Sequence, residues 1–491
     1  MHVHDILAAI PLDRGATAPL FRQLYLRMKE AILAGDIAAS ARLPATRELG
    51  RLLGVSRQTV LAAYEQLMAE GYLEGAVGKG TFVSASLPAA ASSVRADAAA
   101  PLLRPLSARG EAMAAAMARV RHHDGPLRTF RASMPGLDLF PFEAWRKLEA
   151  RHWRRRDLAL GYGGAAGHPP LRELLCAYLK ASRGVRCAPE QIIVTAGSQQ
   201  ALYLLAQLLL APGDGVWLES PGYQGALAPF AVAGARICPV PVDAEGMDVA
   251  YAAARYPDAR LAFATPSHQL PLGVTMSLAR RLELLRWAAA NRAWIVEDDY
   301  DSEYRYTGPP LASLQGLDRS GCVIYVGTLS KVLFPDLRLG YIVAPPALVE
   351  PLARARAVVD RHSPVMPQAV LADFIQEGHF ARHIRRTRDA YGERRIALLE
   401  ALQRRLEGVL AAGPSDTGLD LCVGVTNGLG EAEAAARAAA AGIDLRTLAY
   451  YTNPAAGADC AMPPGLLLGF SAFTPAQIRA GVERLAQALD P

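Results

Sequence analysis

The chain has 491 residues, of which 51% are hydrophobic and 20% charged, and its formal net charge is +5. This length allows two or three domains, and the mildly basic charge permits nucleic-acid contact without requiring it. The six scattered cysteines form no Cys-x-x-Cys pair, no apolar run reaches the roughly 20 residues of a membrane span, and the N-terminus has no export signal. We therefore expect a cytoplasmic protein with no disulfide scaffold and no metal site.

The first 84 residues predict three helices followed by a β-hairpin. Apolar residues recur at helical spacing from Leu20 to Leu33, a second helix is expected from Thr46, and a third over residues 57–69 after a glycine-containing turn. The segment 72–83 is typical of a hairpin with glycines at its tip. Two helices joined by such a turn form a helix-turn-helix, whose second helix enters the major groove of DNA.

This module closely resembles the GntR-type winged helix-turn-helix, on the stretches Leu-Pro-Ala-Thr-Arg-Glu-Leu-Gly (43–50) and Val-Ser-Arg-Gln-Thr-Val (55–60). A protein-interaction module is the alternative, and the basic residues between Arg42 and Arg57, opposed only by Glu48, weigh against it. We predict DNA contacts from residues at the start of the third helix, at the tip of the wing, and at positions that match the family's DNA contacts. These residues are Arg47, Ser56, Arg57, Gln58, Thr59, Lys79 and Gly80.

Residues 85–125 are rich in Ala, Ser and Pro and predict a partly ordered linker. From 126 to 491, strand-like and helical segments alternate. Fully apolar strands of this kind predict an α/β fold with a mostly parallel sheet that is covered on both faces and binds ligands at the carboxyl ends of its strands. The clearest expected strands are 192–195, 216–219, 261–264, 294–297, 323–326 and 337–344.

Polar clusters follow several of these strands. The turn Gly327-Thr-Leu-Ser-Lys331 precedes Arg338, which we expect inside the last strand. A lysine amine can form a Schiff base with a carbonyl cofactor, while hydroxyls and a guanidinium can hold a phosphate. On its own, this turn is more typical of an ordinary loop lysine.

The other clusters change that interpretation. Ser198 and Gln199 begin a helix, where a phosphate is favoured, and Tyr223 lies on a rigid turn suited to stacking on a flat ring. Asp298 can pair with a pyridine nitrogen, and Tyr300 can bond a phenolic ring oxygen. The acidic run 298–303 lacks the glycine of an EF-hand. Together the clusters are complementary to one phosphate-bearing pyridine.

Residues 126–491 resemble the fold-type I aminotransferases, which use pyridoxal 5′-phosphate (PLP), and the whole chain resembles the MocR/GabR subfamily of GntR-type transcription regulators. The shared stretches include 161–172, 194–202, 219–223, 265–273, 297–304 and 327–331. The resemblance implies a catalytic role for Lys331 as the Schiff-base lysine. It implies cofactor contacts from Ser198, Gln199, Tyr223, Asp298, Tyr300, Thr328, Ser330 and Arg338. It also implies a homodimer in which Tyr162 reaches the neighbouring subunit's cofactor.

Two positions depart from the aminotransferase pattern. Leu270 stands where these enzymes commonly place an asparagine against the ring oxygen, and His268 or Gln269 is the candidate to compensate. Leu467 and Ala472 lie where relatives carry an arginine for the substrate carboxylate. Arg446 is the candidate replacement, or the effector is PLP itself.

The sequence therefore predicts a PLP-dependent transcription regulator that senses PLP, an amine or an amino acid and binds operator DNA. One alternative is an active aminotransferase that carries a DNA-binding domain. The other is a regulator that no longer binds the cofactor, and the intact Lys331, Asp298 and Arg338 argue against it.

Overall fold

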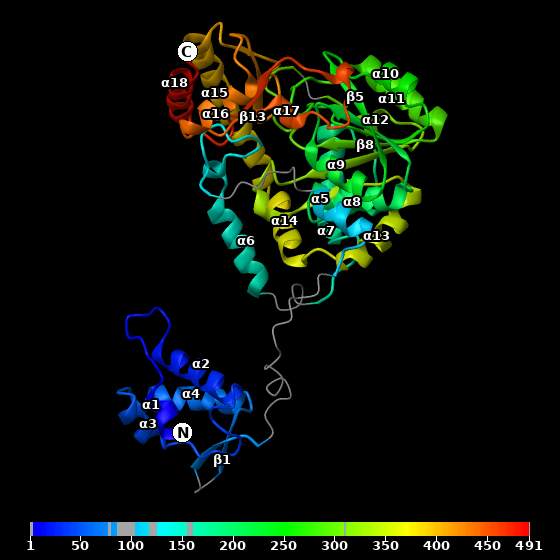
Figure 1. Ribbon diagram of the computed structural model, residues 1–491. Helices are drawn as coiled ribbons and strands as arrows, with labels where there is room; N and C mark the ends of the chain where they lie inside the picture. The colour runs from blue at the N-terminus through cyan, green and yellow to red at the C-terminus, as the bar shows by residue number, and fades with distance from the viewer. Residues whose placement is uncertain are drawn as a thin grey trace. The chain divides into compact units, whose positions relative to one another are not determined.

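The computed structural model describes residues 3–76, 80–85, 104–116, 125–154, 161–308 and 311–490. The chain forms two compact units, Met1–Pro105 and Leu106–Pro491 (Figure 1). Among the described helices, none combines the length and hydropathy that crossing a bilayer would need. All six cysteines are buried free thiols.

The N-terminal unit is a three-helix module with a two-stranded wing, as predicted. Its elements are α2 (Leu20–Leu33), α3 (Thr46–Leu52), α4 (Arg57–Ala69), β1 (Leu73–Ala76) and β2 (Gly80–Val83). Ser56 caps α4 by accepting a hydrogen bond from the Thr59 amide at 3.1 Å, and β1 pairs with β2 in antiparallel register. An additional helix, α1 (Val3–Ala8), buries Leu7 in the core of this module and was not predicted.

An eight-stranded sheet dominates the second unit, with the order β3-β10-β9-β8-β7-β4-β5-β6. Strands β9, β8, β7, β4 and β5 are parallel, and β10 runs antiparallel between β9 and β3. The carboxyl ends of β3, β4, β7, β8 and β9 therefore meet at one edge of the sheet. The strand bounds are Ile192–Thr195 (β3), Gly215–Ser220 (β4), Arg236–Asp243 (β5), Gly246–Met247 (β6), Ala259–Ala264 (β7), Trp294–Asp299 (β8), Val323–Thr328 (β9) and Gly340–Val343 (β10).

Helices cover both faces of this sheet, which explains the unbroken apolar character of its strands. Alternate residues of β9 show the arrangement: Tyr325 packs among α7 and α14, whereas Val326 packs among α8, α9 and α13. The helices around this sheet are α6 (Phe142–Arg154), α7 (Pro169–Arg183), α8 (Ser198–Leu209), α9 (Gln224–Val232), α10 (Val249–Arg255), α11 (Leu278–Asn291), α12 (Leu314–Leu317), α13 (Pro346–Asp360) and α14 (Val365–Gln376).

The C-terminal part forms a second, antiparallel sheet in the order β11-β12-β14-β13. Helices α15, α16 and α18 share a core with its strands, and the short helix α17 lies at its edge, in contact with β13 and β14. These elements are β11 (Leu410–Ala412), β12 (Asp420–Val425), β13 (Arg446–Thr447) and β14 (Gly465–Gly469), with α15 (His379–Leu406), α16 (Glu431–Ala440), α17 (Leu448–Tyr451) and α18 (Pro475–Leu489).

One local expectation changes, and the segment 85–125 contains a helix, in keeping with a partly ordered linker. Arg338 does not lie inside a strand: it follows a single 3-10 turn (Pro335–Leu337) in the left-handed conformation, with φ of 49°, and β10 begins only at Gly340. That conformation is incompatible with an extended strand. Within the segment 85–125, a helix, α5 (Ala108–Ala116), packs against α9 of the second unit.

Candidate functional site

A cavity of about 200 Å³ lies at the edge where the carboxyl ends of the strands meet. Chain segments that follow β3, β4, β7, β8 and β9 all contribute to its wall. Its lining residues are Ser133, Gly197, Ser198, Gln199, Tyr223, Leu270, Asp298, Tyr300, Thr328, Ser330, Lys331, Pro335 and Arg338. The fold thus brings together nine of the ten residues predicted for the cofactor.

Lys331 reaches this cavity from the turn after β9. Its Nζ donates a hydrogen bond to the carbonyl oxygen of Ser133 at 2.8 Å. Burial lowers the pKa of Lys331, although the carboxylates of Asp420, Asp301 and Asp298 act in the opposite direction. A lowered pKa leaves more of the amine neutral, which is the form that attacks a carbonyl carbon.

Donors suited to a phosphate gather at one end of the cavity. Ser198 is the first residue of α8, and Gly197 before it has a φ of +94°. Both residues line the cavity, so the start of this helix, with its free amides, lies beside it. The guanidinium of Arg338 lies over Gly197 and donates to the Ala196 carbonyl at 3.0 Å. With the hydroxyls of Thr328 and Ser330, these groups form an anion-binding end.

Asp298 is an acidic residue that lines the same cavity. It is 4% exposed, and within the described part of the chain its Oδ1 atom has no hydrogen-bond partner. Burial, together with the nearby carboxylates of Asp299, Glu219 and Asp301, raises the pKa of Asp298 to about 8. A buried carboxyl oxygen without a partner in a ligand cavity fits a protonated ring nitrogen, which would favour the ionised carboxylate.

Tyr223 and Gln199 form one wall together. The Tyr223 hydroxyl donates to Gln199 Oε1 at 3.5 Å, and Gln199 Nε2 donates to the Gly225 carbonyl at 2.9 Å. The amide of Gln199 thus fastens the turn that carries the aromatic ring, in addition to lining the cavity.

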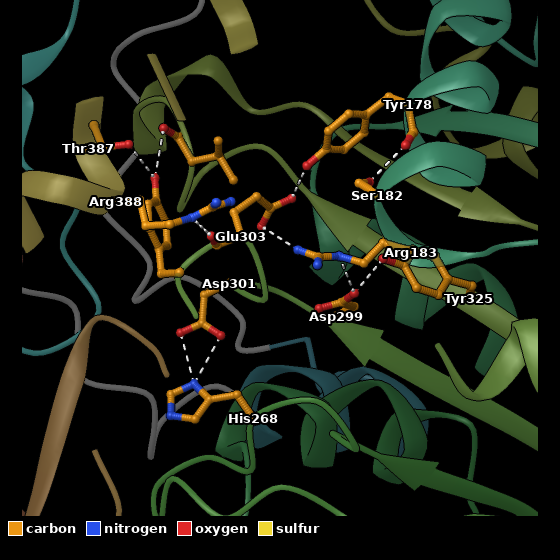
Figure 2. Close-up of polar contacts among 12 residues, drawn as sticks. Tyr178, Ser182, Arg183, His268, Asp299, Asp301, Glu303, Tyr325, Thr387 and Arg388 are labelled. Atoms are coloured by element: carbon orange, nitrogen blue, oxygen red, sulfur yellow. Dashed lines mark hydrogen bonds and ion pairs between the residues drawn. The ribbon is translucent and has the colours of Figure 1, made fainter. Parts of the chain in front are cut away.

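The end of β8 and the segment that follows it are held by a buried ionic network (Figure 2). Arg183 of α7 lies 3.4 Å from Asp299 and 3.6 Å from Glu303. The hydroxyls of Tyr325 and Tyr178 donate to those carboxylates at 2.6 and 2.8 Å, respectively. Because this segment also carries Asp298 and Tyr300, the network fixes the positions of two cavity residues.

The position of the expected asparagine is filled by an apolar side chain, Leu270, which lines the cavity. Gln269 does not compensate, because its Nε2 donates to the carbonyls of Pro221 and Leu270, both at 2.8 Å. His268 instead contacts the hydroxyl of Tyr300, at 3.1 Å from Nδ1.

Tyr162 is the predicted cofactor residue that this chain does not bring to Lys331. It is 82% exposed and lines a different cavity, where the guanidinium of Arg361 lies 4.5 Å from its ring. Arg446, the candidate carboxylate partner, is the cross-strand neighbour of Leu467 but lies over the ring of Tyr450 and lines a third cavity. Leu467 is 1% exposed and packs against Leu270.

The predicted DNA contacts in the first unit lie around the start of α4. The side chains of Arg47, Ser56, Arg57 and Gln58 are exposed, and Thr59 is half-buried beneath Ser56. Arg57 Nε donates to Thr46 Oγ1 at 3.4 Å, which brings it beside the start of α3. Gly80 opens β2 with a φ of +111° over Arg42, whereas Lys79 lies outside the described residues.

Two contributors were missed by the sequence analysis. One is Ser133, with φ of 62°, whose carbonyl oxygen accepts the hydrogen bond from the Lys331 amine. The other is Asp420, whose Oδ1 accepts a hydrogen bond from the Ser133 amide at 2.7 Å. Both lie far from Lys331 in the sequence, and a backbone carbonyl leaves no residue-type signal. Only the contact between β12 and the segment before α6 reveals them.

Comparisons with known proteins agree with both units. The model of bacterial regulatory proteins of the gntR family matches residues 20–83, and that of aminotransferase class I and II matches residues 133–485. The chain is 43% identical to the probable rhizopine catabolism regulatory protein MocR of Rhizobium meliloti, covering 97% of this chain and 95% of that protein.

Two further relatives bear on the cofactor. The chain is 32% identical to the pyridoxine biosynthesis transcriptional regulator PdxR of Corynebacterium glutamicum, over 81% of this chain and 82% of that protein. The crystal structure of Pyrococcus horikoshii kynurenine aminotransferase in complex with PMP is similar with a TM-score of 0.68 and 30% identity, covering 75% of this chain and 93% of that one.

Proposed function

The chain belongs to the GntR family of bacterial regulators that carry an aminotransferase class I and II domain, the MocR-type transcription regulators, and we propose that the state of its PLP cofactor controls how it binds operator DNA. The protein is a helix-turn-helix regulator whose second domain uses PLP. The sensing of an effector, and the residues that perform it, are the proposal.

The observation that carries the proposal is the convergence of Lys331, Asp298 and Arg338 on one cavity. These three side chains are complementary to the aldehyde, the ring nitrogen and the phosphate of one molecule. Lys331 would hold it covalently, and Tyr223 would lie against its ring. Ser198, Gln199, Thr328 and Ser330 would surround its phosphate. When bound, PLP supplies a carbon that exchanges one amine for another.

The residues of the chain hold the cofactor-binding groups in position. The network around Arg183 keeps Asp298 in place, the α8 amides and Arg338 keep the anionic end in place, and the lowered pKa keeps Lys331 reactive. An incoming amine that displaces the Lys331 amine would free that side chain to move relative to Ser133.

For an effector to control DNA binding, the protein must have two arrangements that differ in their affinity for DNA, and the effector must bind one of them more tightly than the other. We propose a cytoplasmic homodimer in which Tyr162 completes the partner's cavity, because its exposed ring and its place away from Lys331 in the same chain suit such a contact. The domain limits that we propose are 1–84, 85–125 and 126–491. Operator contact would come from Arg47, Ser56, Arg57, Gln58, Thr59, Lys79 and Gly80.

An active aminotransferase is the second candidate, and the intact cofactor end of the cavity favours it. The buried Leu467 opposes it, since an aliphatic side chain cannot pair with a substrate carboxylate.

Turnover separates the two candidates. We expect an amine or amino acid to change the visible spectrum of the PLP-loaded protein once, without steady production of keto acid. Continuous transamination in the presence of an amino acid and a keto acid, above the rate of free PLP, would replace the regulatory assignment by the enzymatic one.

A further inference from the structure

His268 is a buried residue of the segment after β7 and lies against Gly418, which precedes β12. It is 5% exposed, and its Nδ1 atom lies 3.0 Å from both carboxylate oxygens of Asp301 (Figure 2). The same Nδ1 lies 3.1 Å from the hydroxyl oxygen of Tyr300, which lines the cavity. One ring nitrogen therefore faces both a carboxylate and the hydroxyl of a residue that lines the cavity.

The proton on Nδ1 follows from this geometry. A carboxylate is an acceptor only, so Asp301 requires an N–H at Nδ1. Burial would lower the pKa of His268, but the carboxylates, Asp301 foremost, outweigh it and raise that pKa. The Tyr300 hydroxyl is in turn kept protonated, because burial and then Asp301 raise its pKa well above the usual value.

The hydroxyl of Tyr300 has only one direction left for its hydrogen. Since Nδ1 already carries a proton, it cannot accept the Tyr300 hydrogen, and Tyr300 can offer its oxygen as a second acceptor. The hydrogen then points away from His268, on the side where Tyr300 lines the cavity. The imidazole thus orients a donor without reaching the cavity itself.

No amide replaces this donor on the wall formed by residues 269 and 270, and the packing around His268 fixes its ring. Leu270, which shares the wall, has no polar atom, and the amide of Gln269 is already used by Pro221 and by its own neighbour. Gly418 lies against the imidazole so closely that a Cβ there would overlap the His268 ring, and its amide donates to the Tyr304 carbonyl at 2.8 Å. The C-terminal part of the chain thus holds His268 from behind.

We infer that His268, held by Asp301, is a positioning residue that turns the Tyr300 hydroxyl toward the ring oxygen of the bound cofactor. This inference rests on the proposed binding of PLP at Lys331. It assigns to the His268–Asp301–Tyr300 group the work that an amide at position 270 would otherwise share.

The readout is the pH midpoint of the visible absorption band of the full-length, PLP-loaded protein. A donor to the ring oxygen stabilises its negative charge and weakens its hold on the proton of the adjacent Lys331 nitrogen, so losing the donor raises the midpoint. Other groups that face His268 and Tyr300 also act on this midpoint and stay unchanged in every variant: Glu219, Asp298, Asp299 and Asp420.

We expect His268→Phe to raise the midpoint by about one pH unit, a tenfold change in proton affinity. Tyr300→Phe should raise it at least as much, and the double variant should match Tyr300→Phe alone, because both changes act through the same Tyr300 hydroxyl. His152→Phe is the matched control, since His152 is equally buried and pairs with Asp373 at 2.8 Å outside this cavity. That control should leave the midpoint where it is in the wild type.

An additive shift in the double variant, or an unmoved midpoint in His268→Phe while Tyr300→Phe moves it, overturns the inference. If His268→Phe takes up no cofactor, His268→Gln decides: its neutral amide still donates to Asp301 but holds Tyr300 less firmly, so a smaller shift that disappears in the Tyr300→Phe background supports the inference. No shift, or a shift that persists in that background, contradicts it. Failure of the underlying PLP proposal looks different, because the wild-type protein would then show no visible band at all.

Discussion

Replacing Lys331 by Ala is expected to abolish the visible absorption band of the purified protein. The band requires a covalent link between the cofactor and an amine, and Lys331 is the amine that lines the cavity between Asp298 and Arg338. The variant should fold, since truncation leaves the Ser133 carbonyl within reach of water and removes a group whose charge is disfavoured by burial.

Absorption spectra and the PLP content of the dialysed protein measure this effect. Lys147→Ala is the matched control, because Lys147 lies exposed on α6 and loses the same charge. The control should keep the band of the wild type. A Lys331→Ala protein with an unchanged band would show that another amine carries the cofactor and would remove the assignment of this site.

Arg57→Ala is expected to abolish specific operator binding while the visible spectrum stays intact. Arg57 is the first residue of α4, exposed at the helix end that meets the base edges in a helix-turn-helix. Loss of one arginine contact to a base costs about 1–3 kcal/mol at each half-site, and a dimer incurs it twice.

Gel-shift titration measures the loss on a duplex selected from random DNA by the wild-type protein. Arg27→Ala is the control of equal charge, because Arg27 lies on α2 and pairs with Glu30 at 3.0 Å. If Arg57→Ala retained specific binding, or if Arg27→Ala lost as much, then α4 would not be the recognition helix.

Much of the fold could be predicted because each element has a local signature. The three helices of the first unit follow from apolar spacing and from Ser56 as a cap, and the strands of the large sheet follow from apolar runs that match two covered faces. The order of the strands adds what local pattern cannot show: β10 is antiparallel, so its beginning, and with it Arg338, reaches the same edge as the ends of its neighbours.

The cavity residues predicted from sequence lie at or close to the ends of strands, where their residue types are informative. The parts that escaped prediction depend on contacts between distant segments. Ser133 acts through a backbone carbonyl, and Arg183 acts through buried charges on another helix, so neither has a residue pattern of its own. The left-handed turn at Arg338 was also missed, because an apolar run predicts a strand but not the residue at which it begins.

If the cofactor domain controls DNA binding, the dissociation constant for the selected duplex must depend on the state of the cofactor. It should be measured at one salt concentration for the PLP-loaded protein, the cofactor-stripped protein and Lys331→Ala. Coupling between two sites is typically about 1–3 kcal/mol, so we predict at least a fivefold difference between loaded and stripped protein, with Lys331→Ala resembling the stripped form whether or not PLP is added. Equal dissociation constants for the loaded and stripped protein would show that the cofactor does not control DNA binding.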